Sequence, residues 1–490
     1  TRPKALDREA NRRARPGKKR FLLLQNRTEH LSSMNAPLNT ETLQQLSAKA
    51  KEVLLGNWTS QFTKPAPNLY PHQWNWDAGF IALGFMHFDM PKAEAELRHL
   101  FSGQWENGML PQIVFGEEAG ARYFPGPDFW QTKGVPNSPK GASTSGITMP
   151  PVHGFVLLEL YKHATDTESA KAFLKEMYPK VLASHRYLYE NRDPNEEGLV
   201  YVRHPWEPGT DNSPTWDRVL ESLDTTKLNI PPYQRQDLSH DSAAAHRPTQ
   251  TDYDRYVYLV DLFRRHKYND EAIFKECPFL IQDPLFNGIL AWSNESLIEI
   301  GGILGEDVSE LVQWNELTIY SLNEKLWNED RGTYDAWDLA NDQRLECHTS
   351  SGLMPLIGLV PTQEQAEEML LKLESNLYSG SPDEPVFWCP TYQLDQKDLN
   401  YEKYWRGPVW INMNWLLYRG LLRYDMKDAA ERLRNDSLQL IAKNGFYEYF
   451  DPRKSKENNA GYGTNNFSWT AALCLDFLKK NGIIILNAEF

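Results

Sequence analysis

The chain has 490 residues, of which 41% are hydrophobic and 24% are charged. No stretch approaches the roughly 18 consecutive apolar residues of a membrane span, so the sequence predicts a soluble globular protein with no membrane partner. Residues 1–33 carry ten Lys and Arg against three Asp and Glu, a balance of +7. Because the net charge is −14, the remainder carries −21. An acidic body of this kind disfavours binding to nucleic acid or anionic lipid.

The first 33 residues differ from the rest of the chain in composition. The start TRPKALDREANRRARPGKKR is rich in Arg and poor in apolar residues. These features fit an organellar transit peptide, an added leader or a mis-assigned start. Met34 stands just before the first helix-like pattern, and we expect it to be the natural start, with residues 1–33 disordered.

Helical periodicity is the dominant signal from about residue 40. Apolar residues recur at helical spacing in TETLQQLSAKAKEVLLGNW, in FLKEMYPKVLASHRYLYENRD and over residues 309–327. Clear alternating strands are scarce. We therefore predict an all-α fold.

Two of these helical segments end in a similar sequence. YENRDPNEEGLVYV and LWNEDRGTYDAW each contain an Asn, then acids, then Gly198 or Gly332, then a short aromatic or β-branched run. NGFYEYFDP around Glu448 is a looser third copy. A helix, a tight glycine turn and a short hairpin that recur along a chain suggest helical hairpins arranged in a ring. Since no Gly/Ser linker or low-complexity tract divides this body, we expect residues 34–490 to form a single domain.

The cysteines and histidines give no indication of a metal or cofactor. No CxxC motif occurs, so disulfide scaffolding and thiolate zinc sites are not expected, and reduced thiols fit a cytoplasmic location. His240 and His246 are six residues apart, a spacing that does not put two ligands on one helix face. We find no phosphate-binding Gly-rich loop and no nucleophile elbow. The four widely separated cysteines are Cys277, Cys347, Cys389 and Cys474.

Aromatic, polar segments between the helices indicate a sugar site. Flat rings stack on the C–H faces of a pyranose, while carboxylates and amides bind its hydroxyl groups. Nucleobase sites also use flat rings, but the acidic charge argues against them. The segments are LYPHQWNWDAGF (69–80), WENGMLPQIVF (105–115), WEPGTDNSPTWD (206–217), YEKYWRGPVWINMNW (401–415) and NGFYEYFDP (444–452).

Glycosidic cleavage needs two carboxyl groups, one protonated near the bridging oxygen and one ionised. Asp211, between two tryptophans and beside Gly209, suits the acid, and Glu448 suits the base. Asp211 also fits a helix cap through Asp211-Asn212-Ser213-Pro214. Asp77 fits sugar binding as well as catalysis, and composition does not rank the three acids.

Several motifs in order resemble glycoside hydrolase family 63, in particular its short bacterial and plant members that hydrolyse mannosylglycerate or glucosylglycerate. They are HQWNWDAGF, WENGMLPQIVF, GTDNSPTWD, YWRGPVWINMNW and FYEYFDP followed by GYGTNNFSWTAA, and they span about residues 55–480. The resemblance implies an (α/α)6 barrel and an inverting mechanism, with Asp211 as general acid and Glu448 as general base. It also implies a sugar subsite that contains Tyr70, Trp74, Trp76, Asp77, Gln112, Gly209 and Trp410.

The resemblance further implies a subsite for the leaving group. In the glycerate-cleaving members an Arg and a Tyr similar to Arg247 and Tyr253 hold the substrate carboxylate, and a guanidinium fork suits that group. The same stretch, AAAHRPTQTDYDRY, also reads as a helix start. One departure is clear: near FSWTAA those members carry a Gln that contacts glycerate, and here Tyr462 or Gly463 stands at that place. The resemblance places Tyr123, Tyr404 and Trp405 in the rest of that subsite.

The sequence thus predicts an inverting α-glycosidase that hydrolyses a small α-glucoside or α-mannoside, glucosylglycerate or mannosylglycerate being the expected substrate. Tyr462 keeps open a trehalase-like or processing-glucosidase-like enzyme for neutral α-glucosides. A non-catalytic sugar-binding barrel is the alternative from another class, and the presence of both Asp211 and Glu448 argues against it. A small-molecule glycoside is the expected partner, and a homo-oligomer is left open.

Overall fold

The structure is a computed structural model that describes residues 37–67, 69–116, 123–235, 238, 246–456 and 460–479. Contacts divide the chain after Asn39, and the described residues from Thr40 onward belong to one compact unit. The basic segment 1–33, Met34 and His240 lie outside the described residues.

The described residues are mainly helical, in agreement with the predicted class. Short strands and two 3₁₀ segments connect the helices, and a π-turn, η3 (Leu322–Leu326), extends α12. The helices are α2 (Thr40–Asn57), α3 (Asn75–Phe85), α4 (Met90–Ser102), α5 (Pro127–Trp130), α6 (His153–His163), α7 (Thr167–Arg192), α8 (Asp217–Glu221), α9 (Gln250–Arg265), α10 (Asp270–Glu276), α11 (Pro284–Leu304), α12 (Ser309–Ser321), α13 (Gln363–Glu374), α14 (Asn376–Ser379), α15 (Ile411–Arg423), α16 (Lys427–Asn444) and α17 (Ser468–Lys479); the 3₁₀ segments are η2 (Pro214–Trp216) and η4 (Ser350–Gly358).

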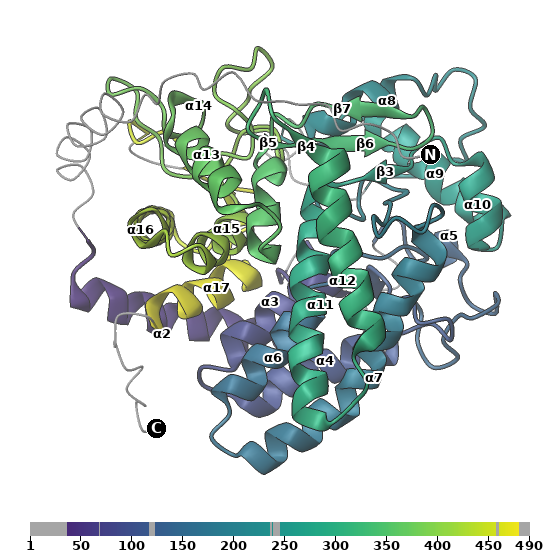
Figure 1. The fold of residues 1–490 in the computed structure, drawn as a ribbon, viewed down its shortest axis with the longest axis horizontal. Helices are drawn as coiled ribbons and strands as arrows, with labels where there is room; N and C mark the ends of the chain where they lie inside the picture. The colour runs from purple at the N-terminus through teal and green to yellow at the C-terminus, as the bar shows by residue number, and fades with distance from the viewer. Residues whose placement is uncertain are drawn as a thin grey trace, which may run out of the picture. The chain divides into compact units, whose positions relative to one another are not determined.

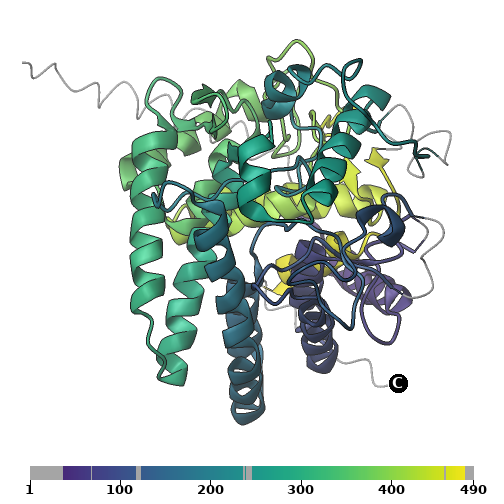
Figure 2. The same cartoon turned by 90° about the vertical axis from the view of Figure 1, so that its right-hand side faces the viewer.

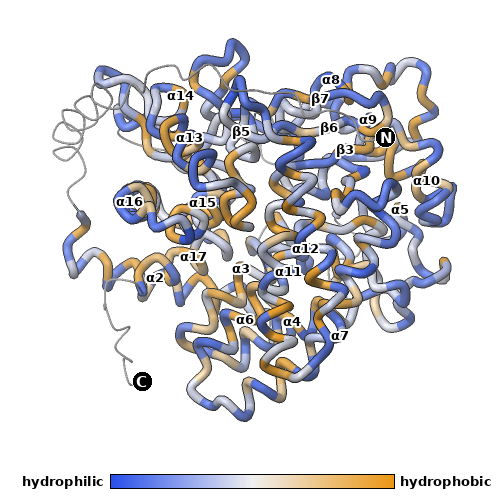
Figure 3. Tube along the Cα trace, in the orientation of Figure 1, coloured by the Kyte–Doolittle hydropathy of each residue, from blue (hydrophilic) through white to orange (hydrophobic). Residues whose placement is uncertain are grey.

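Six of these elements pack on one another in a sequence of contacts that returns to its start. Helix α17 packs on α3, α3 on α6, α6 on α11, α11 on η4, η4 on α15, and α15 on α17. These elements are buried along most of their length; every residue of α3 and of η4 is buried. A helix that is hydrophobic on all sides belongs in a core, and Figure 3 shows hydrophobic residues gathered on these helices while peripheral loops are mostly hydrophilic.

A second set of helices covers this inner set from outside. Helix α2 packs on α17, α4 on α3, α7 on α6 and α11, α12 on α11, and α16 on α15. They are amphipathic: α2, for example, buries Leu43, Leu46, Ala50 and Leu54 on one face. Figure 1 shows α7, α11 and α12 running side by side, with β3–β7 and their loops at one end. The view in Figure 2 shows the same separation of long helices from loops and short elements.

The strands are two or three residues long and pair antiparallel. They form the sheets β1–β2, β3–β6–β7, β4–β5 and β8–β9. Their bounds are β1 (Gln73–Trp74), β2 (Ile113–Val114), β3 (Ile281–Gln282), β4 (Trp327–Asn328), β5 (Thr333–Tyr334), β6 (Ala336–Asp338), β7 (Gln343–Leu345), β8 (Tyr449–Phe450) and β9 (Gly461–Tyr462).

The predicted recurrence of a helix, a glycine turn and a short hairpin is observed in two of the three segments. Gly332 has φ +58° and lies in the β4–β5 hairpin, and β8–β9 follows α16. Gly198 also has a positive φ of +78°, but there the chain forms no hairpin of its own; instead Val202 bridges to Ile281 of β3. A strand from another segment therefore takes the place of the second strand.

Candidate active site

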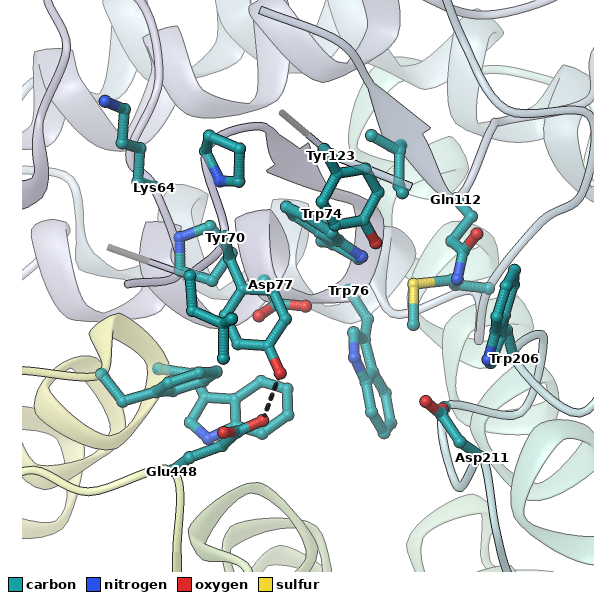
Figure 4. Close-up of a pocket in the computed structure, with 18 of the residues that line it drawn as sticks. Lys64, Tyr70, Trp74, Trp76, Asp77, Gln112, Tyr123, Trp206, Asp211 and Glu448 are labelled. Carbon is teal, nitrogen blue, oxygen red and sulfur yellow. Dashed lines mark hydrogen bonds between the residues drawn. The ribbon is translucent and has the colours of Figure 1, made fainter. Parts of the chain in front are cut away.

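A cavity of about 830 Å³ collects most of the predicted site residues. Its walls carry aromatic rings and three carboxyl groups, those of Asp77, Asp211 and Glu448 (Figure 4). Two cationic side chains, Lys64 and Arg247, also line it. The other predicted residues on its walls are Tyr70, Trp74, Trp76, Gln112, Tyr123, Gly209, Tyr253, Tyr404 and Trp405.

The β1–β2 pair brings the first two aromatic motifs together. Trp74 pairs with Ile113, and the backbone N–H of Asn75 donates to the carbonyl of Gln112 at 2.9 Å. Helix α3 then begins, so Asp77 lies in its first turn, where the helix dipole favours a negative charge. Burial, the largest contribution, nevertheless raises the pKa of Asp77 well above its usual range. Asp77 and the amide of Gln112 are thus held on one wall of the cavity.

The loop WEPGTDNSPTWD is anchored from behind by a buried ion pair. The carboxylate of Glu207 accepts from both terminal nitrogens of Arg192 at 3.0 and 3.1 Å, and all of these atoms are shielded from solvent. It also accepts from the backbone N–H groups of Arg203 at 2.6 Å and Thr148 at 3.2 Å. Partnered by charges and donors on every side, the buried carboxylate fixes the path of the loop.

Gly209 in this loop meets two requirements that only glycine satisfies. Its φ is +76°, a left-handed conformation in which side chains are rare. A Cβ atom there would lie 2.4 Å from Cζ2 of Trp76, a residue that is 1% exposed. The backbone of the Asp211 loop therefore lies directly against the Trp76 ring.

Asp211 lines the cavity and is only partly buried. The residue that caps η2 is Ser213 and not Asp211: the Ser213 side chain accepts from the Thr215 N–H. Asn212 accepts from the backbone N–H of Trp405 at 2.9 Å, which ties this loop to the YWRG segment. In Figure 4 the Asp211 carboxylate and Glu448 lie on opposite sides of Trp76.

Glu448 is surrounded by hydrogen-bond donors. Its Oε1 accepts from the Tyr70 hydroxyl at 2.8 Å and from the Tyr404 hydroxyl at 3.4 Å, and its Oε2 accepts from Arg247 Nη2 at 3.2 Å. Arg247 also donates through Nη1 to the Tyr70 oxygen at 2.9 Å. Gly463, at φ +76°, approaches so closely that a Cβ atom would lie 2.2 Å from Oε2.

Opposing influences set the charge of Glu448. Burial, the largest of them, raises its pKa above the ordinary value, and Arg247, the next largest, lowers it. Hydrogen bonds from Tyr70 and Tyr404 also lower the pKa of this carboxyl. The net pKa is raised, yet the guanidinium and two hydroxyl groups support the ionised form that a base requires.

Arg247 and Tyr253 lie at the helix start that the sequence allowed, and their role toward a substrate carboxylate stays a prediction. Helix α9 begins with a capping box, in which Thr249 and Asp252 satisfy each other's backbone N–H groups. Arg247 lies just before it and points to Glu448, and Tyr253 lines the cavity. A helix start therefore carries both side chains into the site.

Two predicted residues do not line the cavity. Trp410 is fully buried and stacks behind Trp405, with ring centroids 3.8 Å apart and an interplanar angle of 6°. Tyr462 is turned away, and its hydroxyl donates to Glu402 at 2.8 Å. Its backbone lies opposite Tyr449, next to Glu448.

Of the two tryptophans that flank Asp211 in the sequence, Trp206 lines the cavity, whereas Trp216 is buried and donates to the carbonyl of Thr210. Trp469 also lines the cavity and belongs to the quoted motif FSWTAA, so its aromatic signal was present but was not assigned. Lys64 follows α2, between Phe62 and the first aromatic motif, and no local signal identified it as a wall residue. Among the described residues, no group of three or more His, Cys, Asp or Glu side chains is arranged to hold a metal, and no helix is long and apolar enough to cross a membrane.

Three carboxyl groups in one cavity lined by aromatic rings suit the cleavage of a glycosidic bond, and the comparisons with known proteins identify the chain as a glycoside hydrolase. The family model of the mannosylglycerate hydrolase MGH1-like glycoside hydrolase domain matches residues 70–470. The chain belongs to this family, a part of glycoside hydrolase family 63.

Proteins of known activity are similar over nearly their whole length. The mannosylglycerate hydrolase of Rubrobacter radiotolerans is 42% identical over 440 residues, which cover 89% of this chain and 98% of that protein. The glucosylglycerate hydrolase of Mycolicibacterium hassiacum is 35% identical over 445 residues, 89% of this chain and 98% of that protein. The crystal structure of the family 63 mannosylglycerate hydrolase from Thermus thermophilus, in complex with Tris and D-glycerate, matches with a TM-score of 0.80 at 41% identity, covering 88% of this chain and 99% of that one.

Proposed function

We propose that this enzyme hydrolyses a small α-glycoside whose leaving group carries a carboxylate, mannosylglycerate or glucosylglycerate, with inversion at the anomeric carbon. The observation that carries the proposal is Arg247 in the wall of a cavity that also holds Asp211 and Glu448. A neutral leaving group would not need a buried guanidinium, whereas a carboxylate matches its planar fork. The names of the similar proteins support the same substrate class.

Asp211 is the general acid in this proposal. Its carboxyl protonates the glycosidic oxygen as the bond to the anomeric carbon breaks, so the alcohol leaves neutral. Glu448 is the general base: it takes a proton from a water that attacks the opposite face of the sugar. The water's oxygen becomes the new anomeric hydroxyl, and inversion follows because only one displacement occurs. The two carboxyl groups lie on either side of Trp76, which supports separate acid and base roles on opposite faces of a bound sugar.

The sugar is expected to lie between the aromatic wall and the polar one. Trp74 and Trp76 offer ring surface, while Asp77 and Gln112 offer groups that bind hydroxyls. Gln112 lines the cavity, and its buried Oε1 has no hydrogen-bond partner among the described residues, which favours the side-chain amide as a group that binds a sugar hydroxyl. Trp410 supports this surface indirectly by holding the plane of Trp405.

The leaving group is expected on the side of Arg247. Two of its nitrogens are engaged by Glu448 and Tyr70, and the guanidinium has five N–H donors in all. Tyr253 and Tyr123 lie on the same cavity, and Lys64 adds a second positive charge. Together these residues offer a carboxylate the counter-charge and donors that a neutral sugar would not use.

The fold that carries this site is proposed to be a single (α/α)6 barrel spanning residues 34–490. The closed sequence of contacts from α3 through α6, α11, η4, α15 and α17, with further helices outside it, supports that architecture.

Proton NMR of the anomeric signals tests the proposal. We expect the wild-type enzyme to cleave α-mannosylglycerate or α-glucosylglycerate, and the β-anomer of the free sugar to appear first. A first product with α configuration would contradict inversion. Cleavage of neutral α-glucosides such as trehalose, with no cleavage of either glycerate compound, would contradict the proposed leaving group.

A further inference from the structure

Glu402 lies at the centre of a polar cluster beside the cavity. Its Oε1 accepts from the Tyr462 hydroxyl at 2.8 Å and from Lys456 Nζ at 3.1 Å, and its Oε2 lies 3.5 Å from His246 Nε2. Lys456 also contacts the Tyr462 hydroxyl, and the His246 ring meets the Tyr462 ring edge-on at 5.1 Å. We call Glu402, His246, Lys456 and Tyr462 the rim cluster. None of the four lines the cavity.

Two members of the rim cluster, His246 and Glu402, are close in the chain to residues that contact Glu448, and a third, Tyr462, is close to Glu448 through strand pairing. His246 directly precedes Arg247, and Glu402 lies two residues before Tyr404. Tyr462 belongs to β9, which pairs with the strand that follows Glu448. The cluster thus joins three segments that are remote in sequence, close to the points where they deliver Arg247, Tyr404 and Glu448 to one another.

We propose that Glu402 is a positioning residue, which holds the segments of Arg247 and Tyr404 against Glu448 through its contacts with His246, Lys456 and Tyr462. The inference rests on the proposed function, because it assigns Glu402 a role in the activity of the base. It also gives Tyr462 a function that requires no contact with substrate. In this chain Tyr462, near the place of the expected Gln, connects two segments of the cavity wall through its hydrogen bond to Glu402.

The exposure of these side chains favours a geometric role over a stabilising one. The Glu402 side chain is 41% exposed, and those of Lys456 and His246 are 22% and 20% exposed. Ion pairs at this exposure contribute little to the free energy of unfolding. Hydrogen bonds and charges from Tyr462, Lys456 and His246 lower the pKa of Glu402, the Tyr462 hydrogen bond most, so its charge is available to hold all three partners.

The activity of Glu448 is the sensitive readout. Arg247, Tyr70 and Tyr404 act on it by direct contact. Asp77 and Tyr449 also interact with it electrostatically, without a hydrogen bond to it among the described residues. Any loosening of Arg247 or Tyr404 leaves Glu448 buried with less support for its charge, so its pKa rises. A base with a higher pKa requires a higher pH to become ionised, and the acidic limb of the pH profile of kcat/KM then moves upward.

The test compares E402Q with wild type. Gln keeps the size and one acceptor oxygen but removes the negative charge that pairs with Lys456 and lies near His246. We expect kcat/KM on the cleaved glycerate substrate to fall about tenfold, since small displacements of catalytic groups cost up to about a hundredfold. We also expect the acidic limb to move upward and the affinity for D-glycerate, measured by calorimetry, to fall. The matched control is E346Q, because Glu346, like Glu402, contacts a cationic side chain and a histidine, here Arg331 and His348, each at 3.0 Å, and does not line the cavity.

A second variant protects the test against misfolding of the first. Y462F removes the hydroxyl that donates to Glu402 but keeps the ring against His246, and it should shift the same limb in the same direction by a smaller amount. Because the two residues share one network, the effects of E402Q and Y462F should not add in the double variant. The inference is overturned if E402Q has the wild-type kcat/KM, acidic limb and affinity for D-glycerate while the wild type is active. If E402Q does not fold, the same result in Y462F overturns it. Either result leaves the proposed function standing. A wild type that cleaves no glycoside would overturn both.

Discussion

Arg247 donates from Nη2 to Oε2 of Glu448 at 3.2 Å, so the cation that is proposed to bind the leaving group also touches the proposed base. Both side chains are almost fully buried. An opposite charge at this distance favours the ionised carboxylate and offsets part of the rise in pKa that burial causes. The two proposed roles therefore couple substrate binding to the ionisation of the base through one guanidinium.

We expect R247M to lower kcat/KM and to move the acidic limb of its pH profile upward. With the guanidinium gone, the pKa of Glu448 rises further, because burial still acts and its main counter-charge does not. At a fixed pH near this limb, a smaller fraction of the base is ionised. R247K keeps a positive charge but loses the planar fork. Its acidic limb should therefore lie between those of R247M and wild type, while KM for glycerate substrates should be higher than in wild type. A profile that moves downward in R247M would show that the interaction has the opposite sign.

The two carboxyl groups should respond differently to the leaving group. D211N and E448Q should each lower kcat by about 10²- to 10⁴-fold on the natural substrate, the usual contribution of an acid or base, while calorimetry should still detect substrate binding. An α-glycosyl fluoride needs little protonation as fluoride leaves. D211N should therefore recover much of its activity on the fluoride, and E448Q should not. Recovery in E448Q instead would exchange the two assignments.

The sequence predicted the outer helices better than the inner ones. Helices α2, α7 and α12 are amphipathic, and their apolar spacing gave their positions directly. The inner α3 and η4 are buried on every side, so no polar face marks a period. The contacts that return from α17 to α3 join segments nearly 400 residues apart, which no local pattern can reveal.

The sequence predicted which residue types form the site better than it predicted the direction in which each side chain faces. The aromatic motifs stand out in the sequence, the family resemblance singled out Asp211 and Glu448 among the acids, and the structure brings all of them to one cavity. Trp410 and Tyr462 have the same aromatic character, but one stacks behind Trp405 and the other turns to Glu402. Which way a side chain faces is decided by tertiary packing, so it required the structure.

Replacement of Gly209 should separate backbone strain from damage to the site. G209A places a Cβ atom 2.4 Å from the Trp76 ring at φ +76°. The left-handed conformation alone costs about 1–2 kcal/mol, and the clash should also displace the ring, which lowers kcat/KM. G305A is the control, because Gly305 has φ +79° with nothing within 4 Å of its Cβ position. Both variants should lose thermal stability, and only G209A should lose activity; equal activities would mean that Trp76 adjusts without consequence.

Asp283 predicts a pH dependence of stability that is independent of catalysis. It caps α11, accepting from the Phe286 N–H at 3.0 Å, and burial raises the pKa of its carboxyl from 3.8 to about 7. Between these two values the unfolded chain releases a proton that the folded protein retains. The free energy of unfolding therefore falls as pH rises through this window, by up to about 1.4 kcal/mol per unit, and levels off above about pH 7.

D283N should flatten this dependence, because Asn does not titrate and caps helices about as well as Asp. Urea unfolding of wild type and variant at pH 5 and 6.5 measures the difference. The control is D166N, at the solvent-exposed cap of α7, which should leave the wild-type slope unchanged. If D283N keeps the full slope, Asp283 is ionised in the folded protein, and the hydrogen bond from Phe286 then outweighs the cost of burying its charge.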